Sequence, residues 1–332
     1  MYFRTQPILP LSLLFLLLAS GFVTALLGGS TFNLQLRHLW EALSGNQTLA
    51  TELILSLRLP RVLIASAVGA ALAISGALMQ GITRNPLASP TLFGINAGAA
   101  CLLVVGQTIS IPLLSDMPLL IQTMLGALLA GAAVFLLSGG TTGRLHPSRM
   151  ILAGVAVNAL FLALTRTLLI LDEQAQSVVS WLAGSLVDTD WTHWQQLWPA
   201  VLLGISVSLL LSQKLNLLAL GDEAAAGLGG SPERLRLQVS AVVVLLAGSA
   251  VAVSGPIAFL GLLVPHLARL LVGQDYRMLL PTTGMLGAAL LCWADYLSRL
   301  LIFPTETPVG LVLALLGAPF FIWLSRRQGR TA

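Results

Sequence analysis

Few side chains in this sequence could do chemistry, and those few are widely spaced. His38, His146, His193 and His266 lie in four separate segments, and the two cysteines stand alone in apolar runs. Neither pattern has the spacing of metal ligands or of a disulfide framework, and no Ser/His/Asp set is apparent. The single lysine, Lys214, is not part of a Gly-Lys-Ser/Thr phosphate loop. We therefore predict no catalytic centre, no metal site and no nucleotide site on this chain.

Charged groups within apolar segments are also rare. Asp295 and Arg299 are four residues apart, so they could pair with each other on one helix. Arg166 is the one fixed charge inside a span. Because an arginine that faces lipid is costly, the Arg166 side chain should either face a cavity or a partner, or extend to the nearby membrane surface. Carriers driven by protons or sodium usually keep carboxylates or histidines at this depth. Their scarcity argues against a self-contained secondary carrier.

The most unusual polar segment is LALGDEAAAGLGGSPERLRL, residues 218–237. It is rich in alanine, carries Asp222 and Glu223 near its start, contains several glycines and a proline, and ends with Arg234 and Arg236. The segment is too short and too polar to cross a bilayer. A transporter without its own energy source needs a cytosolic surface on which a motor can push, and we predict that a short helix in this segment provides it.

The elements that position these residues are predicted to be membrane-spanning helices. Of the 332 residues, 56% are hydrophobic and 9% charged, whereas soluble domains are about 25% charged. Spans need about 20 apolar residues, and Ser254-Gly255-Pro256 should divide one long window into two. The fold class is therefore an all-α integral membrane protein of about ten helices in a single domain, 1–332. The charge-free windows are 5–36, 62–83, 85–115, 117–143, 150–165, 191–213, 237–268, 278–294 and 307–325.

The basic residues indicate the orientation of these spans. With ten helices, 12 of the 17 basic residues fall on the cytosolic side, 4 fall outside, and Arg166 lies within a helix. A single span over 237–268 would instead give 8 on each side. We therefore expect both termini in the cytosol, with a cytosolic loop at about 213–236. Topology also explains the basic excess without a nucleic-acid partner.

A weak internal repeat accompanies this topology. RLPRVLIASAVGAALAISGALMQ begins at Arg58, and RLRLQVSAVVVLLAGSAVAVSGPIAF begins at Arg234. Each has a basic cluster, an Ala/Val/Gly-rich helix and a Ser-Gly pair near its far end, and the two would cross the membrane in opposite directions. That arrangement is typical of the inverted repeats of transporters, although shared helix composition would also produce such a match.

Over almost its whole length the chain resembles the permease subunits of ATP-driven importers for iron(III)-siderophore complexes and vitamin B12, the FecCD type. The resemblance implies a type II importer fold with inverted repeats and no enzymatic activity. It rests on RLPR (58–61), AISGALMQGITRNPLASPTLFGINAGAA (73–100), MILAGVAVNA (150–159), SWLAGSL (180–186), LNLLALGDEAAAGLG (215–229), SGPIAFLGLLVPHLARL (254–270) and PVGLVLALLGAPFFIWL (308–324).

The resemblance also implies partners and roles for individual residues. Separate ATPase subunits would bind ATP and Mg. A second permease subunit, either a paralogue or a second copy of this chain, would complete the pore in the bacterial inner membrane. A periplasmic or lipid-anchored binding protein would deliver the cargo. The segment 218–229 would be the coupling helix that contacts the ATPase. Arginines on the outer face would receive acidic groups of the binding protein. The residues assigned are Leu218, Gly221, Asp222, Glu223, Leu228 and Gly229 for coupling, Arg58 and Arg299 for docking, and Pro147 and Ser148 for an inner gate.

Two features bear on the gate and the cargo. Vitamin B12 permeases have small hydroxyl residues at the gate, so Pro147 departs from their pattern. The sequence around Arg166, LTRTLLIL, is most similar to the ferric-citrate permeases, and an arginine that lines the path would favour an anionic cargo such as ferric citrate. Other siderophores, haem and cobalamin remain alternatives, because selection belongs mainly to the binding protein.

Overall fold

The computed structural model describes residues 8–28, 34–44, 46, 48–109, 114, 117–140, 147–171, 181–302 and 305–328. All regular structure in these ranges is helical. The long helices are α1 (Ile8–Leu27), α4 (Leu59–Thr83), α5 (Ile95–Thr108), α7 (Leu119–Leu137), α8 (Pro147–Leu171), α10 (Trp191–Ala219), α12 (Pro232–Ser254), α13 (Leu260–Val272), α14 (Tyr276–Leu301) and α15 (Val309–Gln328). The short ones are α2 (Leu36–Leu43), α3 (Leu49–Glu52), the π-helix η1 (Leu53–Arg58), η2 (Pro90–Phe93) and α11 (Asp222–Gly227).

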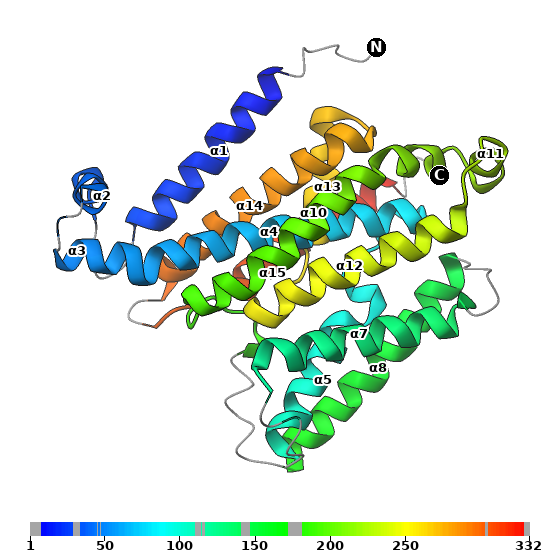
Figure 1. Cartoon of the computed structure of the whole chain (residues 1–332), viewed down its shortest axis with the longest axis horizontal. Coiled ribbons are helices and arrows are strands. Elements are labelled where there is room, and N and C mark those ends of the chain that lie inside the picture. The colour runs from blue at the N-terminus through cyan, green and yellow to red at the C-terminus, as the bar shows by residue number, and fades with distance from the viewer. Residues whose placement is uncertain are drawn as a thin grey trace.

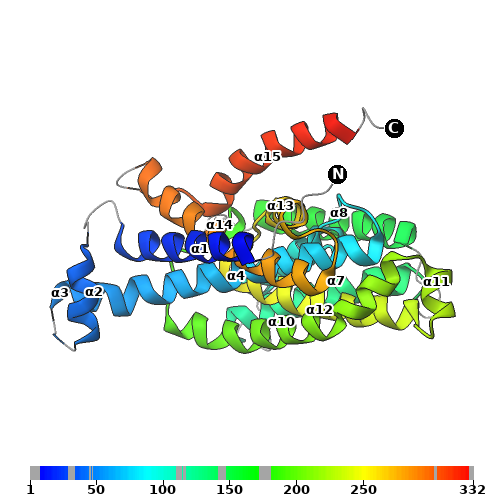
Figure 2. The ribbon, with the colours of Figure 1, turned by 90° about the horizontal axis from the view of Figure 1, so that it is seen from above.

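Helix α4 runs through the centre of the molecule, flanked by α10, α12, α13 and α14, while α5, α7 and α8 form a group on one side (Figure 1). Helix α1 packs on α14, and α15 lies at the edge (Figure 2). Helices α4, α10, α12 and α14 share one general direction, so the molecule has two ends (Figures 1 and 2). Helices α2 and α3 lie at one end, and α11 lies at the other (Figures 1 and 2).

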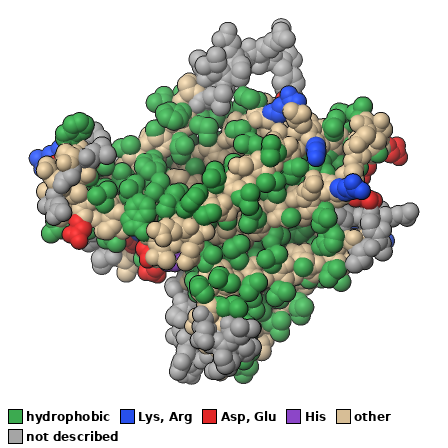
Figure 3. Space-filling view, viewed as in Figure 1, with side chains coloured by type: hydrophobic (Ala, Val, Ile, Leu, Met, Phe, Trp, Pro, Cys, Tyr) green, Lys and Arg blue, Asp and Glu red, His purple; other side chains and the backbone are tan. Residues whose placement is uncertain are grey.

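The surface matches a membrane environment. Hydrophobic side chains cover the band between the two ends, and charged side chains gather at the ends themselves (Figure 3). Within the described ranges, six helices are long and apolar enough to cross a membrane, and four shorter apolar helices accompany them. These ten helices confirm the predicted all-α, multi-pass fold.

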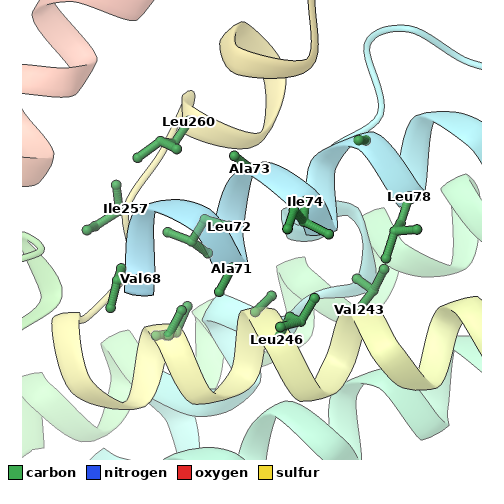
Figure 4. Close-up of a cluster of buried hydrophobic side chains, with 14 of the residues drawn as sticks. Val68, Ala71, Leu72, Ala73, Ile74, Leu78, Val243, Leu246, Ile257 and Leu260 are labelled. Atoms are coloured by element: carbon green, nitrogen blue, oxygen red, sulfur yellow. The ribbon is translucent and has the colours of Figure 1, made fainter. Parts of the chain in front are cut away.

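The core forms where α4 meets α12 and the segment before α13. Val68, Leu72 and Ile74 of α4 pack with Leu246 of α12 and with Ile257 (Figure 4). Arg236, in the first turns of α12, bonds to the carbonyl of Ile82 near the end of α4. The two helices therefore run in opposite directions, as the predicted repeat requires.

Glycines allow the closest helix crossings of α4. A Cβ atom on Gly69 would lie 2.3 Å from the carbonyl oxygen of Gly287, and one on Gly76 would lie 1.9 Å from that of Gly261. Such distances leave room for hydrogen only, so α4 meets α14 and α13 backbone to backbone. In lipid, where association relies on packing, small residues make this approach possible.

The predicted break in window 237–268 is confirmed. Helix α12 ends at Ser254, and Gly255 has a φ of +68°. A Cβ atom on Gly255 would lie 2.1 Å from the carbonyl oxygen of Trp181, so both the turn and the space require glycine. Helix α13 then has only 13 residues, about 20 Å at 1.5 Å per residue.

Two other expectations need correction. The windows 150–165 and 191–213 underestimate α8 and α10, which extend to Leu171 and Ala219. A charged residue ended each window, but the helices continue through Arg166 and Lys214, because charge limits burial in lipid and not helix formation. The loop expected at 213–236 is accordingly confined to residues 220–231, within which α11 forms.

Candidate functional site: the α11 end and the arginine cluster opposite

Helix α11 is a single exposed turn and a half that connects α10 to α12 (Figure 1). Gly221 precedes it with a φ of +121°, and Gly229 follows it with a φ of +81°. Both values are unfavourable for residues with a side chain. A Cβ atom on either glycine would meet no atom within 4 Å, so backbone conformation, and not crowding, explains these glycines.

Asp222, in the first turn of α11, is held by two arginines from the helix bundle. Arg236 donates through Nη2 to both carboxylate oxygens of Asp222, at 2.8 and 2.9 Å. Arg84, which follows α4, also donates to Asp222, and it donates to the carbonyl of Leu218 at 3.0 Å. Arg236 is only 3% exposed and also reaches the carbonyl of Ile82 at 3.3 Å. These contacts tie α11 to the end of α4 and to the first turns of α12.

The structure divides the residues assigned to coupling into two sets. Leu218 is buried, and Asp222 is directed toward the two arginines. Glu223, Leu228 and Gly229 face outward, and the Leu228 side chain is 64% exposed. A leucine so exposed at the charged end of the molecule is available to a protein partner. Glu223, Leu228 and Gly229 therefore present the most accessible surface of this segment, whereas Asp222 and Gly221 are partly buried.

The start of α14 is fastened to the end of α10 nearby. Asn216 donates through Nδ2 to Asp275 at 2.6 Å and accepts a bond from the backbone N–H of Tyr276 at 3.0 Å. The backbone N–H of Arg277 also donates to Asp275. These donors, the Arg277 amide above all, lower the pKa of Asp275 below its usual value. Asp275 therefore stays ionised as the N-cap of α14.

At the opposite end, two arginines and two acids form a cluster. Arg61 donates to Asp295 at 2.8 and 2.9 Å and to Glu306 at 2.8 Å. Arg299 pairs with Asp295 at 3.1 Å, which confirms the pairing that their spacing predicts. The Asp295 side chain is fully buried. Two arginines thus compensate one buried carboxylate, which leaves that carboxylate fixed in place.

Arg58 and Arg299 also cap the end of α1. Arg58 donates to the carbonyls of Leu26 and Leu27, at 3.1 and 2.7 Å. Arg299 donates to the carbonyls of Ala25 and Gly28, at 2.7 and 3.2 Å. The last carbonyls of a helix lack partners within it, and cations favour this terminus. Arg58 is half-buried and Arg299 is 6% exposed, so Arg299 in particular presents little surface to a docking protein.

Helix α8 carries the predicted gate and path residues. Pro147 is its first residue, and Ser148 next to it is exposed. Arg166 is exposed and makes no ion pair with any residue that the structure describes. It lies five residues before the helix end at Leu171, about 7.5 Å along the axis. The structure does not bring Arg166 close to the gate residues, which lie at the other end of the same helix.

Sequence reasoning missed Arg61, Arg84 and Arg236 as members of a site. Arg84 and Asp222 are separated by 138 residues, and Arg61 and Asp295 by 234. No local spacing can reveal such pairs. A signal was nevertheless present for Arg61, because it belongs to the RLPR motif. Among the described residues, no group of three or more His, Cys, Asp or Glu side chains could hold a metal ion.

Several known proteins are similar to this chain in sequence or in structure. The sequence pattern of the FecCD transport family matches residues 14–327. The Fe(3+) dicitrate transport system permease protein FecC of Escherichia coli (strain K12) is 44% identical over 283 residues, covering 85% of each chain. The hemin transport system permease protein HmuU of Yersinia pestis is 42% identical over 333 residues, covering 98% of this chain and 97% of that protein. A solved structure described as an inward-facing metal-chelate type ABC transporter has a TM-score of 0.83 at 33% identity, covering 97% of this chain and 99% of that one.

Proposed function

The chain belongs to the FecCD transport family, and we propose that it is the membrane-spanning subunit through which an ATP-binding-cassette importer passes ferric citrate into a bacterial cell. Permease subunits of this family are not themselves enzymes. The observation that carries the proposal is α11, an exposed helix anchored to the bundle by Asp222. A motor on another chain can push on such a helix.

In this proposal the α11 end faces the cytosol and binds the ATPase. Glu223, Leu228 and Gly229 contact the ATPase, whereas Leu218, Gly221 and Asp222 set the position of the helix. ATP and Mg are bound by the ATPase and no cofactor by this chain. The chain would lie in the bacterial inner membrane, with both termini in the cytosol. Helix α1 supports that placement, because its C-terminal carbonyls meet Arg58 and Arg299 at the opposite, outer end.

A substrate-binding protein, periplasmic or lipid-anchored, would dock at that outer end. Arg58 is the better of the two arginines for this role, because its side chain is half-buried and that of Arg299 is almost fully enclosed. Charge pairs at the rim of an interface mainly steer docking and fix its register. Arg299 supports docking indirectly, by holding Asp295 and the end of α1.

A second permease subunit would cover α8. In an 18-residue window of α8 only 17% of residues are buried within this chain, compared with 83% for the segment that contains α4. An arginine on such an uncovered apolar helix is costly in lipid. We infer that Arg166 faces a path between two permease subunits, with Pro147 and Ser148 at its inner end. The second subunit is a paralogue or another copy of this chain.

Ferric citrate is the proposed cargo because it is anionic and Arg166 supplies a positive charge to the path. FecC, whose name specifies Fe(3+) dicitrate, has 44% identity, and HmuU, whose name specifies hemin, has 42%. Sequence identity alone therefore separates the two cargoes poorly. Another siderophore, haem or cobalamin would use the same architecture.

Uptake measurements in a host that lacks this chain test the proposal. We expect loss of energy-dependent radioiron uptake from citrate and retained uptake from hydroxamate and catecholate complexes and of labelled cobalamin. Loss of a different cargo would keep the permease and reject ferric citrate. Arg166→Gln should reduce ferric citrate uptake without reducing the amount of protein in the membrane. Unchanged uptake would reject its role in the path.

A further inference from the structure

A groove of about 390 Å³ lies between the end of α10, helix α11 and the start of α12. Two basic side chains, Lys214 and Arg234, line it together with an apolar floor. The main apolar contributors are Leu217, Leu218, Leu228, Pro232 and Leu235. A cavity with a basic edge and an apolar floor suits a ligand that is itself both anionic and apolar.

The positive charge of the groove is not compensated within the chain. Lys214 and Arg234 are exposed, and neither forms an ion pair with a carboxylate in the part of the chain that the structure describes. The groove lining includes no aspartate or glutamate. The neighbouring Arg84 and Arg236 differ, because both are bound to Asp222. The two groove cations are therefore available to an anion from outside.

An exposed apolar stripe leads away from the groove along α10. Leu210, one turn before Lys214, is 78% exposed, and Leu203, two turns earlier still, is 57% exposed. Spacings of four and seven residues place these side chains on one face of the helix. The same face thus passes from the apolar band of the molecule to the basic groove. This order of apolar and charged groups matches that of a phospholipid at a membrane surface.

We propose that this groove binds the head group of an anionic phospholipid. Its phosphate lies between Lys214 and Arg234, and one acyl chain lies along Leu210 and Leu203 of α10. A free phosphate would leave the apolar floor and the leucine stripe unused. Binding requires only that the protein sits in a membrane, so it does not depend on the transport assignment. Because Leu228, which directly follows α11, forms one wall, the lipid would also support the position of that helix.

The test compares lipid binding to the full-length protein by native mass spectrometry. Phosphatidylglycerol and phosphatidylcholine with identical acyl chains are titrated into the parent protein and into the double variant Lys214→Gln with Arg234→Gln. Each basic side chain near a membrane surface contributes roughly a factor of five, so the double variant should bind phosphatidylglycerol about 25-fold more weakly. Phosphatidylcholine binding should not change. Arg277→Gln is the matched control, because Arg277 is exposed at the same end but outside the groove.

Several outcomes would overturn the proposal. Unchanged phosphatidylglycerol binding in the double variant, or an equal loss in the Arg277→Gln control, would reject the groove as the site. The charge-preserving exchange Lys214→Arg with Arg234→Lys should retain binding, and a loss there would reject recognition by charge. If inorganic phosphate displaces the lipid at equal concentration, the groove is a simple anion site. If the double variant loses the ATPase but keeps the lipid, the groove is a protein-docking surface.

Discussion

Replacing Arg236 with methionine should release α11 from the helix bundle. The substitution keeps a long side chain of similar shape but removes two bonds to Asp222 and one to the carbonyl of Ile82. Among the described residues, the Asp222 carboxylate would retain its bond from Arg84. Helix α11 would then be fixed by fewer contacts, while the apolar packing of α12 would remain.

The free-energy cost of losing this ion pair follows from how deeply Arg236 and Asp222 are buried. Breaking a fully buried ion pair costs about 3–5 kcal/mol. Arg236 is buried, but the Asp222 side chain is 45% exposed, so water and Arg84 compensate much of the loss. Exposed pairs contribute less than about 1 kcal/mol, and we therefore expect an intermediate cost of about 1–2 kcal/mol. That cost corresponds to an increase of roughly 5- to 30-fold in the population with α11 detached.

Hydrogen exchange at the backbone amides of α11 measures this population. The exchange rates in Arg236→Met should rise by the same factor, and the ratio of cargo transported to ATP hydrolysed should fall. Glu223→Gln is the control, because Glu223 faces outward and should leave the exchange rates of α11 unchanged. If Arg236→Met leaves the protection of α11 intact, the anchoring role of this ion pair is wrong.

Three further substitutions test the packing and the charges. Gly76→Ala places a Cβ atom 1.9 Å from the carbonyl of Gly261, so it should lower the free energy of unfolding by about 1–3 kcal/mol or more. Gly227→Ala is the control, because Gly227 lies in open space and its substitution should not lower this free energy. Equal melting temperatures of the two variants would contradict the close approach of α4 to α13. Asp295→Asn leaves the buried Arg299 and the partly buried Arg61 without their shared carboxylate and should cost about 3–5 kcal/mol; a parent-like melting temperature would refute this. Asp275→Asn should destabilise the protein at neutral pH. The Arg277 amide lowers the pKa of Asp275. The extra stability of the parent protein over the variant is therefore fully present above the ordinary aspartate pKa of about 3.9 and is lost as the pH falls through the lowered pKa. A difference in melting temperature between the two proteins that persists in strong acid would contradict this prediction.

Much of the fold could be predicted from the sequence because lipid imposes simple rules. Apolar length located the spans, and the distribution of basic residues required the break that the structure shows at Gly255. Helix ends were predicted less well: Arg166 closed a charge-free window, yet α8 continues to Leu171. Hydropathy reports where a helix leaves lipid, and it does not report where the backbone stops being helical.

The site was predicted in part. The spacing of Asp295 and Arg299 on one helix was enough to suggest their pair, which the structure confirms. The bonds from Arg236 and Arg84 to Asp222 were not predictable, because the packing of α4 against α12 determines them. For the same reason the sequence could not separate Asp222, which faces inward, from Glu223, which faces outward.

Reconstitution in proteoliposomes tests the central claim most directly. The full-length chain, its partner permease subunit, the ATPase and the binding protein are combined, and accumulation of radioiron supplied as ferric citrate is measured with and without ATP. We predict accumulation that requires both ATP and the ATPase and that is much smaller for ferric hydroxamate. Accumulation without the ATPase, driven by a proton or sodium gradient, would contradict the account.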